Sequence, residues 1–375
     1  MTTDFDIAIC GAGPVGLTLA SLLVRRGVTP ARIALIDAKS AQQVGGDPRS
    51  IALSYGSRQV LEEAGAWPVA AEAIHQIHVS RRGHFGRTLI DRNDHAVPAL
   101  GYVTRYGALV SSLTAVTTAT MLRPVQVIER TEQEADVVLT LSDQRTITAA
   151  IVVQAEGGVF QQQETKSLHR DYEQTAIIAH VTASAPVAHR AFERFTQEGP
   201  LALLPQDAGY ALVWCMRPAT AQRLMTLSDA AFLAALADTF GSRVGRFESV
   251  TPRMTYTLGL NAHPTPSARC VAIGNASQTL HPVAGQGLNL GLRDATVLAR
   301  MLSQELSPDA LVAFAQRRKT DRTLTIRLTD IMARVFASAP DGALSQALLG
   351  LSLGVVDAVG PAKHVLAQQM MFGRR

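Results

Sequence analysis

The sequence GAGPVG at residues 11–16 constrains the fold of this chain more than any other feature. It follows a short apolar segment, DIAIC, and opens a segment of helical periodicity, LTLASLLVRRG, after which comes a second apolar segment, ARIALID. A strand, a glycine turn, a helix and a strand in this order make a βαβ unit. We therefore expect an α/β fold that begins with a dinucleotide-binding turn.

Each glycine of this turn has a physical role. Gly11 permits the tight turn, Gly13 lets the backbone approach a pyrophosphate, and Gly16 lets the helix pack closely on the strand. The N-terminus of the helix then faces the phosphates. Asp37 ends the second strand, where a carboxylate would hold a ribose hydroxyl; a merely solvated acidic residue is the alternative.

Size and composition exclude several classes of protein. A length of 375 residues favours two domains that share an interface, or one domain with a large insertion. A hydrophobic fraction of 47% with 18% charged residues excludes disorder and a coiled coil. The net charge of +4 is small, and no basic run is interleaved with aromatic residues, so nucleic acid is not an expected partner.

The cysteines and the N-terminus favour a cytoplasmic location. Cys10, Cys215 and Cys270 have no CxxC spacing, so neither a zinc site nor a disulfide framework is indicated. Cys10 is expected to be a small buried residue of the first strand. Asp4 and Asp6 stand where a secretion signal would carry basic residues, and no apolar stretch reaches the roughly 20 residues of a spanning helix.

The rest of the chain reads as alternating blocks. We expect a helix from Ser50 to Ala64, strands over residues 76–104 around RNDH, and a hairpin that turns at Ser142 and Asp143. Residues 172–260 are mostly strand-like, with a helix around Ala230 to Phe240. The predicted domains are a nucleotide-binding domain of residues 1–75, 101–170 and 262–330, a β-rich substrate domain of residues 76–100 and 171–261, and a helical region of residues 331–375.

A second glycine-rich stretch, IGNASQTLHPVAGQGLNLGLRD, follows the apolar strand RCVAI. It contains Gly274, Gly285, Gly287 and Gly291, and Pro282 stiffens the turn. Backbone amides of such a loop and the N-terminus of the following helix favour a nearby negative charge. We expect this loop to face a group that becomes anionic, such as the N1/C2 carbonyl edge of a reduced flavin.

Five motifs together resemble a known family. GAGPVG, GDPRSIALSYGS, AFERFTQEGPLALLP, LVWC and GNASQTLHPVAGQGLNLGLRD, in this order, are similar to the group A flavoprotein monooxygenases, and within them to the ubiquinone-pathway hydroxylases. The resemblance covers nearly the whole chain. It implies a Rossmann-like FAD-binding domain of the para-hydroxybenzoate hydroxylase type, an inserted β-sheet substrate domain and C-terminal helices. It also implies bound FAD, NAD(P)H as transient co-substrate and a C4a-hydroperoxyflavin as oxidant.

The resemblance assigns roles to individual residues. The ADP half of FAD would be held by Gly11, Gly13, Gly16 and Asp37, the pyrophosphate or ribityl region by Arg49, and the ribityl or ribose hydroxyls by Asn275. The pyrimidine edge would be lined by Gly285, Gln286, Gly287 and Asn289, with Pro282 over the ring. Glu156 and Gly157 stand where the family usually has Asp-Gly, and Phe160 stands where the family has a serine-containing loop; both departures border the cofactor site.

Some residues allow two interpretations. His281 has the pKa near 6.5 that suits proton transfer to a phenol or a peroxide, but a histidine in a tight turn is as often a structural donor. Trp214 and Phe195 are expected in the core or the pocket wall of the substrate domain. In QRRKTDR, Asp321 lies four residues after Arg317, which is typical of a solvated, ion-paired helix face.

The implied reaction is hydroxylation of the aromatic ring of a polyprenylated phenol, 2-polyprenyl-6-methoxyphenol, in ubiquinone biosynthesis. The alternatives are another ring position, a soluble aromatic substrate, or a non-catalytic FAD-binding scaffold that associates with other quinone-biosynthesis proteins. EGPLALLPQ would supply an apolar wall through Leu201, Leu203, Leu204 and Pro205. An amphipathic region from Leu344 to Val359, with basic ends at Lys363, Arg374 and Arg375, would rest peripherally on the inner membrane or pack as a helix hairpin on the flavin domain.

Overall fold

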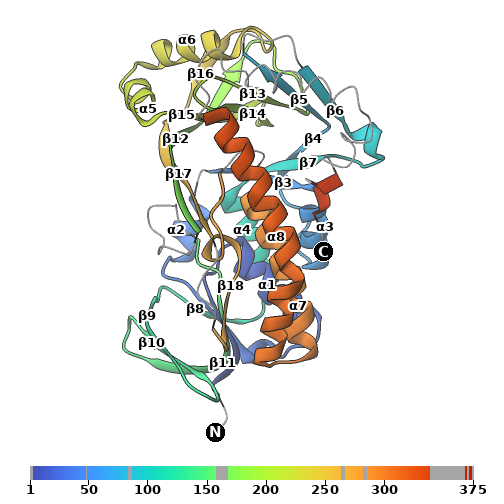
Figure 1. Cartoon of the computed structure of the whole chain (residues 1–375), viewed down its shortest axis with the longest axis vertical. Coiled ribbons are helices and arrows are strands. Elements are labelled where there is room, and N and C mark those ends of the chain that lie inside the picture. The colour runs from blue at the N-terminus through green and yellow to red at the C-terminus, as the bar shows by residue number, and fades with distance from the viewer. Residues whose placement is uncertain are drawn as a thin grey trace.

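The computed structural model describes residues 3–47, 49–82, 87–157, 168–262, 267–281, 285–337, 368–369 and 371–373. The chain forms two lobes along its longest axis (Figure 1). The first lobe contains the N-terminal strand, and the second is a separate sheet at the opposite end of the molecule. A long helix, α8, runs beside both lobes.

The first lobe is built on a sheet with the strand order β8-β2-β1-β11-β10-β9, and β18 also pairs with β11. Helix α1 (Pro14–Arg25) connects β1 to β2, which pairs with β1 in parallel, so the predicted βαβ unit is confirmed. The predicted hairpin is also confirmed, because β10 and β11 are antiparallel neighbours. The strands are β1 (Phe5–Cys10), β2 (Ile33–Ile36), β8 (Thr120–Leu122), β9 (Val127–Glu132), β10 (Val137–Leu141), β11 (Thr146–Gln154) and β18 (Cys270–Ala272).

Helix α1 begins and ends where the sequence predicts. Pro14 occupies the first turn, where its missing N–H costs nothing, and Gly27 follows the helix with φ +95, a conformation that glycine adopts readily. The helix buries an apolar run against the sheet, with Leu17, Leu19 and Leu22 fully buried. Cys10 is buried in β1, as expected.

A small antiparallel sheet, β3-β7-β4, joins the two lobes. The predicted helix from Ser50 to Ala64 is wrong in its first part, since Ser50–Ser54 pair with β7 as strand β3, and the helix begins at Tyr55. The Ser54 hydroxyl caps that helix by accepting from the amide of Ser57. The elements here are α2 (Ala41–Gly45), β3 (Ser50–Ser54), α3 (Tyr55–Glu63), β4 (Ala71–Ile74), β7 (Gly101–Arg105) and α4 (Tyr106–Val116), with short 3-10 turns at Pro30–Arg32 and Arg92–His95.

The second lobe is a sheet with the order β16-β12-β15-β14-β13-β5-β6, and β17 also pairs with β12. Its chain segments come from two parts of the sequence, because β5 and β6 precede β7 to β11. The strands are β5 (Gln76–Arg81), β6 (Arg87–Asp91), β12 (Leu168–Ala183), β13 (Arg190–Phe195), β14 (Pro200–Gln206), β15 (Gly209–Met216), β16 (Phe247–Val250) and β17 (Met254–Ala262).

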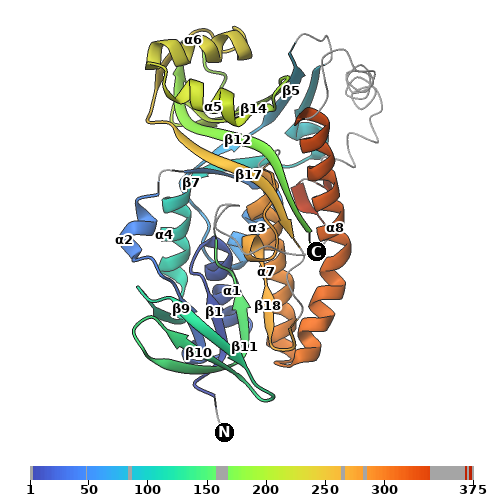
Figure 2. The same ribbon diagram turned by 60° about the vertical axis from the view of Figure 1, so that its left-hand side comes forward.

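Helices α5 (Pro218–Met225) and α6 (Asp229–Phe240) cover the outer face of this sheet (Figure 2). Trp214 and Phe192 pack there against Phe232 and Phe240, so Trp214 is a core residue. Helix α6 was predicted and α5 was not. The sequence of α5, PATAQRLM, is only eight residues long and buries just Ala221 and Leu224, too short a segment for helical periodicity to stand out.

The predicted apolar wall of EGPLALLPQ is wrong as a single surface. Leu201 and Leu203 are buried in the core beneath α5 and α6, whereas Leu204 packs on the opposite face against Ile74 and Val103. Successive residues of a strand point to opposite faces, so only alternate members of this segment can face the first lobe.

Helices α7 (Gln286–Gln304) and α8 (Pro308–Ala337) follow β18 and lie side by side along the first lobe (Figures 1 and 2). In the part of the chain that the structure describes, no helix combines the length and the apolar character needed to span a membrane. The predicted amphipathic region from Leu344 to Val359 lies outside the described residues.

Candidate functional site

The turn after β1 requires glycine for steric reasons. Gly11 has φ +107, and its amide donates to the carbonyl of Ile36 at 2.7 Å. A Cβ on Gly11 would lie 2.7 Å from the backbone of Ala155 and Glu156, and one on Gly16 would lie 2.0 Å from the carbonyl oxygen of Gly11. Any side chain at these two positions would push α1 or β11 away from the turn.

Asp37 fixes the same turn from the neighbouring strand. One carboxylate oxygen accepts from the amide of Ala12 and the other from the amide of Lys39, each at 2.7 Å. The side chain therefore lies directly beside the glycine turn, at the carboxyl ends of β1 and β2. Its contact with a ribose hydroxyl stays a prediction.

The N-terminus of α1 is open at the position that Gly13 occupies. Gly13 is the N-cap residue and provides no side-chain cap. A Cβ here would meet only the hydroxyl of Tyr106, at 3.1 Å. Glycine at this position thus keeps free the space in front of the first amides of the helix, where an anion is stabilised.

Arg49 lies beside this helix start through two contacts. Its guanidinium stacks over the ring of Tyr106, 4.8 Å from the centroid, and forms an ion pair with Asp47 at 2.6 Å. The hydrogen bonds that Arg49 donates to the Asp47 carboxylate raise the pKa of Arg49. Sequence reasoning missed Tyr106, because no local motif marks it. Tyr106 is the first residue of α4, and the packing of this helix places it beside the turn. The helix packs closely there, because a Cβ on the next residue, Gly107, would lie 2.2 Å from the Gly45 carbonyl oxygen.

The second glycine-rich stretch lies against the first. A Cβ on Gly291 would meet Val15 of α1 at 2.8 Å and Gly274 at 3.0 Å, so α7 approaches α1 closely at this point. Gly285 begins α7 with φ +60 and no side-chain cap. Two uncapped helix N-termini, those of α1 and α7, are thereby held in adjacent positions by glycine contacts.

Asn289 connects three segments of the first lobe, and its place at the edge of a bound ring stays a prediction. Its Oδ1 accepts from the Ser54 amide at 2.9 Å and the Ser57 hydroxyl at 2.7 Å, and its Nδ2 donates to the carbonyls of Ala52 at 3.2 Å and Gly285 at 2.7 Å. These four bonds use the whole hydrogen-bonding capacity of the amide. The side chain therefore fixes the start of α7 to β3 and α3.

The remaining residues of the loop differ in exposure. Gln286 is buried, and Asn275 is partly exposed with its Oδ1 3.9 Å from where a Cβ of Gly287 would lie. Among the described residues nothing lies closer to that Cβ position, so packing against them does not require glycine at position 287. Pro282 lies outside the described residues.

His281 is completely buried, which disfavours the predicted role as a proton-transfer catalyst. Its Nε2 lies 2.8 Å from Oε1 of Gln174 on β12, and its ring packs edge-on against Tyr172. Burial lowers the pKa of His281 to about 4, so the ring is neutral at physiological pH. The structure favours the alternative, a structural histidine that connects the loop before α7 to the second lobe.

Glu156 and Gly157 follow β11 and are exposed, directly beside Gly11. This places the departure from the usual Asp-Gly pair next to the dinucleotide-binding turn. Phe160, the second departure, lies outside the described residues. The influence of either on cofactor binding stays a prediction.

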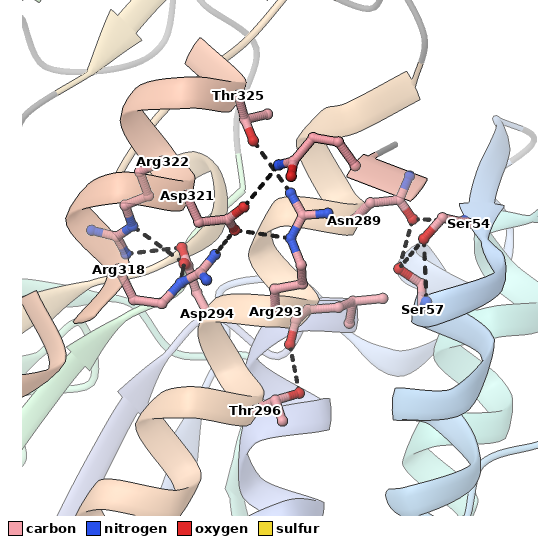
Figure 3. A network of polar contacts seen from close by, with 12 residues as sticks. Ser54, Ser57, Asn289, Arg293, Asp294, Thr296, Arg318, Asp321, Arg322 and Thr325 are labelled. Atoms are coloured by element: carbon pink, nitrogen blue, oxygen red, sulfur yellow. Dashed lines mark hydrogen bonds and ion pairs between the residues drawn. The ribbon is translucent and has the colours of Figure 1, made fainter. Parts of the chain in front are cut away.

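A buried ion-pair network supports the start of α7 from behind (Figure 3). Asp294 is fully buried and binds Arg318 at 2.7 Å and Arg322 at 2.8 Å, while Asp321 binds Arg318 at 2.6 Å and Arg293 at 3.1 Å. Burial opposes ionisation of Asp294, but Arg322 and Arg318 outweigh it and hold the pKa below its usual value. The predicted solvated face in QRRKTDR is therefore wrong, since Asp321 is buried and pairs with Arg318.

These features fit a dinucleotide that carries a redox-active ring. The turn around Gly13 and the N-terminus of α1 suit a pyrophosphate, and Asp37 lies one strand further, at the distance of an adjoining ribose in such folds. The N-terminus of α7 offers amides for a second negative charge. A side chain at Gly13 would project into the space in front of the α1 amides, so the site is shaped for a group bound there.

Comparison with known proteins decides the family. Residues 4–327 match the family model described as an FAD binding domain. The chain belongs to this FAD-binding family. It is 31% identical to the ubiquinone hydroxylase UbiL of Rhodospirillum rubrum, over 98% of this chain and 89% of the relative, and 30% identical to the 3-demethoxyubiquinol 3-hydroxylase of Escherichia coli, over 79% of each chain.

The fold of this FAD-binding chain has solved counterparts. The crystal structure of the p-nitrophenol 4-monooxygenase PnpA from Pseudomonas putida DLL-E4 superposes with a TM-score of 0.78 over all of both chains, at 15% identity. The predicted fold class is thus confirmed: an FAD-binding α/β lobe, a β-sheet lobe inserted into it and C-terminal helices. The chain is a flavin-dependent aromatic hydroxylase with FAD as cofactor.

Proposed function

We propose that the chain hydroxylates the aromatic ring of a polyprenylated phenol, 2-polyprenyl-6-methoxyphenol, in ubiquinone biosynthesis, with O2 and NAD(P)H as co-substrates. The observation that carries this proposal is the similarity over nearly the whole chain to a protein named as a ubiquinone hydroxylase. FAD supplies the oxidising power when bound. The chain supplies the binding, the orientation and the exclusion of water.

Residues at the two helix starts would hold the cofactor. Gly11, Gly13, Gly16 and Asp37 would bind the ADP half, and Arg49 would leave Asp47 or share it to meet the pyrophosphate or ribityl region. The amides of Gly285, Gln286 and Gly287, with Asn275 nearby, would face the pyrimidine edge of the ring. Asn289 and the Asp294 network would keep those amides in place.

The substrate would lie between this loop and the second sheet. The inner face of that sheet approaches the first lobe at the contact of His281 with Gln174 and at the hydrogen bond from Ser50 to Gln206, 2.6 Å long. Between these contacts the inner face is apolar and partly exposed. Each CH2 of a prenyl tail buried there would contribute roughly 0.8 kcal/mol to binding.

Product identification tests the proposal. The purified FAD-loaded chain is mixed with NADH or NADPH, O2 and a short-tailed 6-methoxyphenol, and the products are analysed by mass spectrometry and NMR. We expect one added oxygen on the ring at a single carbon. A hydroxylated soluble phenol without the tail requirement, or oxygen at a different carbon of another quinone precursor, would replace the proposed substrate. Accelerated NAD(P)H oxidation that never yields a hydroxylated ring would contradict the reaction.

A further inference from the structure

The second sheet presents two faces of opposite character. On the outer face, Phe192, Leu203 and Trp214 are buried beneath α5 and α6. On the inner face, one row crosses six neighbouring strands, and each of its members is only partly buried. The row consists of Val79, Glu193, Ala202, Val213, Ile178 and Met254, which are direct register partners.

This row lies between the two places where the sheet contacts the first lobe. Along β12, Gln174 contacts His281 and lies on the same face as Ile178, four residues further along the strand. Along β14, Gln206 accepts from Ser50 and lies on the same face as Ala202. The side chains of the row thus face the first lobe between these two contacts, and they are partly exposed.

Glu193 is the one ionisable residue of this otherwise apolar row. Its neighbours along β13, Ala191 and Phe195, share its face, and Ala191 packs against Ile74 and Val103 of the small sheet. Among the described residues, the carboxylate of Glu193 forms no hydrogen bond or ion pair. Removal from water raises the pKa of Glu193 to about 7.

Three charged residues near Glu193 have other partners or face elsewhere, and one, Arg81, shares its face. Arg194 is on the outer face of β13, where it donates to the carbonyl of Thr239. On the small sheet, Glu72 pairs with His189 and Arg105 pairs with Asp207. Arg81 lies on the inner face, on β5, and burial lowers its pKa. The thiol of Cys215 lies on the same face. Burial raises the pKa of this thiol, and the negative charge of Glu193 raises it further.

A carboxylate that is partly removed from water and has no protein partner gains from a ligand that supplies one. A phenol is a ligand of matching chemistry, because its ring is apolar and its hydroxyl donates one hydrogen bond. We propose that Glu193 is a substrate-contacting catalytic residue, whose carboxylate accepts the hydrogen bond of the phenolic hydroxyl and takes its proton as the ring is hydroxylated. This inference rests on the proposed function of the same site.

The proton balance is simple. The phenolic O–H bond breaks, its proton passes to a carboxylate oxygen of Glu193, and the electron pair stays on the phenolic oxygen, which makes the ring more electron-rich. After the new C–O bond has formed, the ring carbon releases its hydrogen as a proton, which ends in the water formed from the second oxygen atom of O2, and Glu193 returns its proton to the phenolic oxygen. The carboxylate is unchanged over the whole reaction, and O2 and NAD(P)H remain the oxidant and the reductant.

The test compares Glu193→Gln, Glu193→Asp and a control, Glu248→Gln, which alters an exposed glutamate of the same sheet. With a short-tailed 6-methoxyphenol, we expect kcat/KM of Glu193→Gln to fall by about 100-fold or more, with electrons diverted to hydrogen peroxide. Glu193→Asp should restore part of this loss. FAD content, thermal stability and the rate of flavin reduction by NAD(P)H should stay at the wild-type level in all three.

Two pH titrations distinguish catalysis from mere packing. In the wild type, kcat/KM should fall below about pH 7 as Glu193 becomes protonated, and this limb should be missing in Glu193→Gln. The bound phenol should ionise, by ultraviolet difference absorbance, at a pH lower by about one unit in Glu193→Gln, because an anionic neighbour no longer opposes it.

Each result has one meaning. Wild-type hydroxylation with an unchanged rate, pH profile and phenol ionisation in Glu193→Gln would overturn the role of Glu193 and leave the proposed function standing. A wild type that neither binds nor hydroxylates the methoxyphenol would overturn the proposed function and this inference together.

Discussion

The two lobes are specified by different features of the sequence. In the first lobe, the site depends on backbone segments that approach so closely that Gly11 and Gly16 leave no room for a Cβ. In the second lobe, the side chains of the inner row around Glu193 are only partly buried. A single added methyl group should therefore have very different consequences in the two lobes, and this contrast can be measured.

The largest effect is expected from Gly16→Ala. The new Cβ would lie 2.0 Å from the Gly11 carbonyl oxygen, so α1 must move off β1, and we expect a loss of about 3 kcal/mol or more of unfolding free energy. The comparison in the second lobe is Ala202→Val, which adds two methyl groups on the partly open face and should still alter stability by less than about 1 kcal/mol. Chemical denaturation measures both. Equal losses would remove the distinction between the lobes.

The next effect concerns the buried charges behind α7. Asp321→Asn would leave Arg293 without its anionic partner in the protein interior and would leave Arg318 with Asp294 alone, at a cost of about 3–5 kcal/mol. In the second lobe, Asp238→Asn breaks only the exposed pair with Arg82 and should change stability by less than about 1 kcal/mol. Thermal melts compare the two. A small effect of Asp321→Asn would mean that water reaches this network.

The contact between the lobes at His281 predicts a pH dependence. Burial lowers the pKa of His281 to about 4, below the value of about 6.5 in the unfolded chain. The unfolded state then binds more protons between these pH values, so this contribution to stability is complete above about pH 6.5 and is lost as the pH falls toward 4.

The maximal loss from this histidine is about 3 kcal/mol. His281→Gln keeps a neutral partner for Gln174 and should flatten this part of the curve. The measurement is urea unfolding of both proteins at several pH values. Parallel curves for the two proteins would show that His281 is protonated equally in both states.

The smallest effect is electronic. In the part of the chain that the structure describes, the Cβ of Gly287→Ala meets no atom nearer than 3.9 Å, so the fold should be unchanged. If the α7 amides face the flavin pyrimidine edge, the added methyl group should displace the ring and weaken an anion stabilisation of about 0.3–1 kcal/mol, which lowers the flavin reduction potential. Spectroelectrochemical titration measures the flavin reduction potential of the wild type and of Gly287→Ala, and a thermal melt shows whether the variant is stably folded. An unshifted potential in a stably folded variant would place this loop away from the ring.

Predictions from the sequence succeeded where backbone geometry dictates residue type. The βαβ unit and both glycine-rich stretches could be located, because a tight turn or a close helix contact excludes other residues there. Ser50 to Ser54 could not be recognised as a strand, since its partner β7 lies about fifty residues away in the chain. Tertiary packing also determines the position of Tyr106, the burial of Asp321 and the face of the sheet on which Leu201 lies. A local sequence pattern does not contain this information.

The central claim is that the N-terminal turn is shaped for the pyrophosphate of FAD rather than for packing. Gly13→Val tests it most directly, because a Cβ at this position meets, among the described residues, only the movable Tyr106 hydroxyl. Gly45→Ala, which adds a methyl group in open space, is the control. We predict a folded Gly13→Val protein with a near wild-type melting temperature before FAD is added, and FAD affinity at least about 100-fold weaker, or about 2.7 kcal/mol. Stoichiometric FAD in folded Gly13→Val, by absorbance after gel filtration, would contradict the claim.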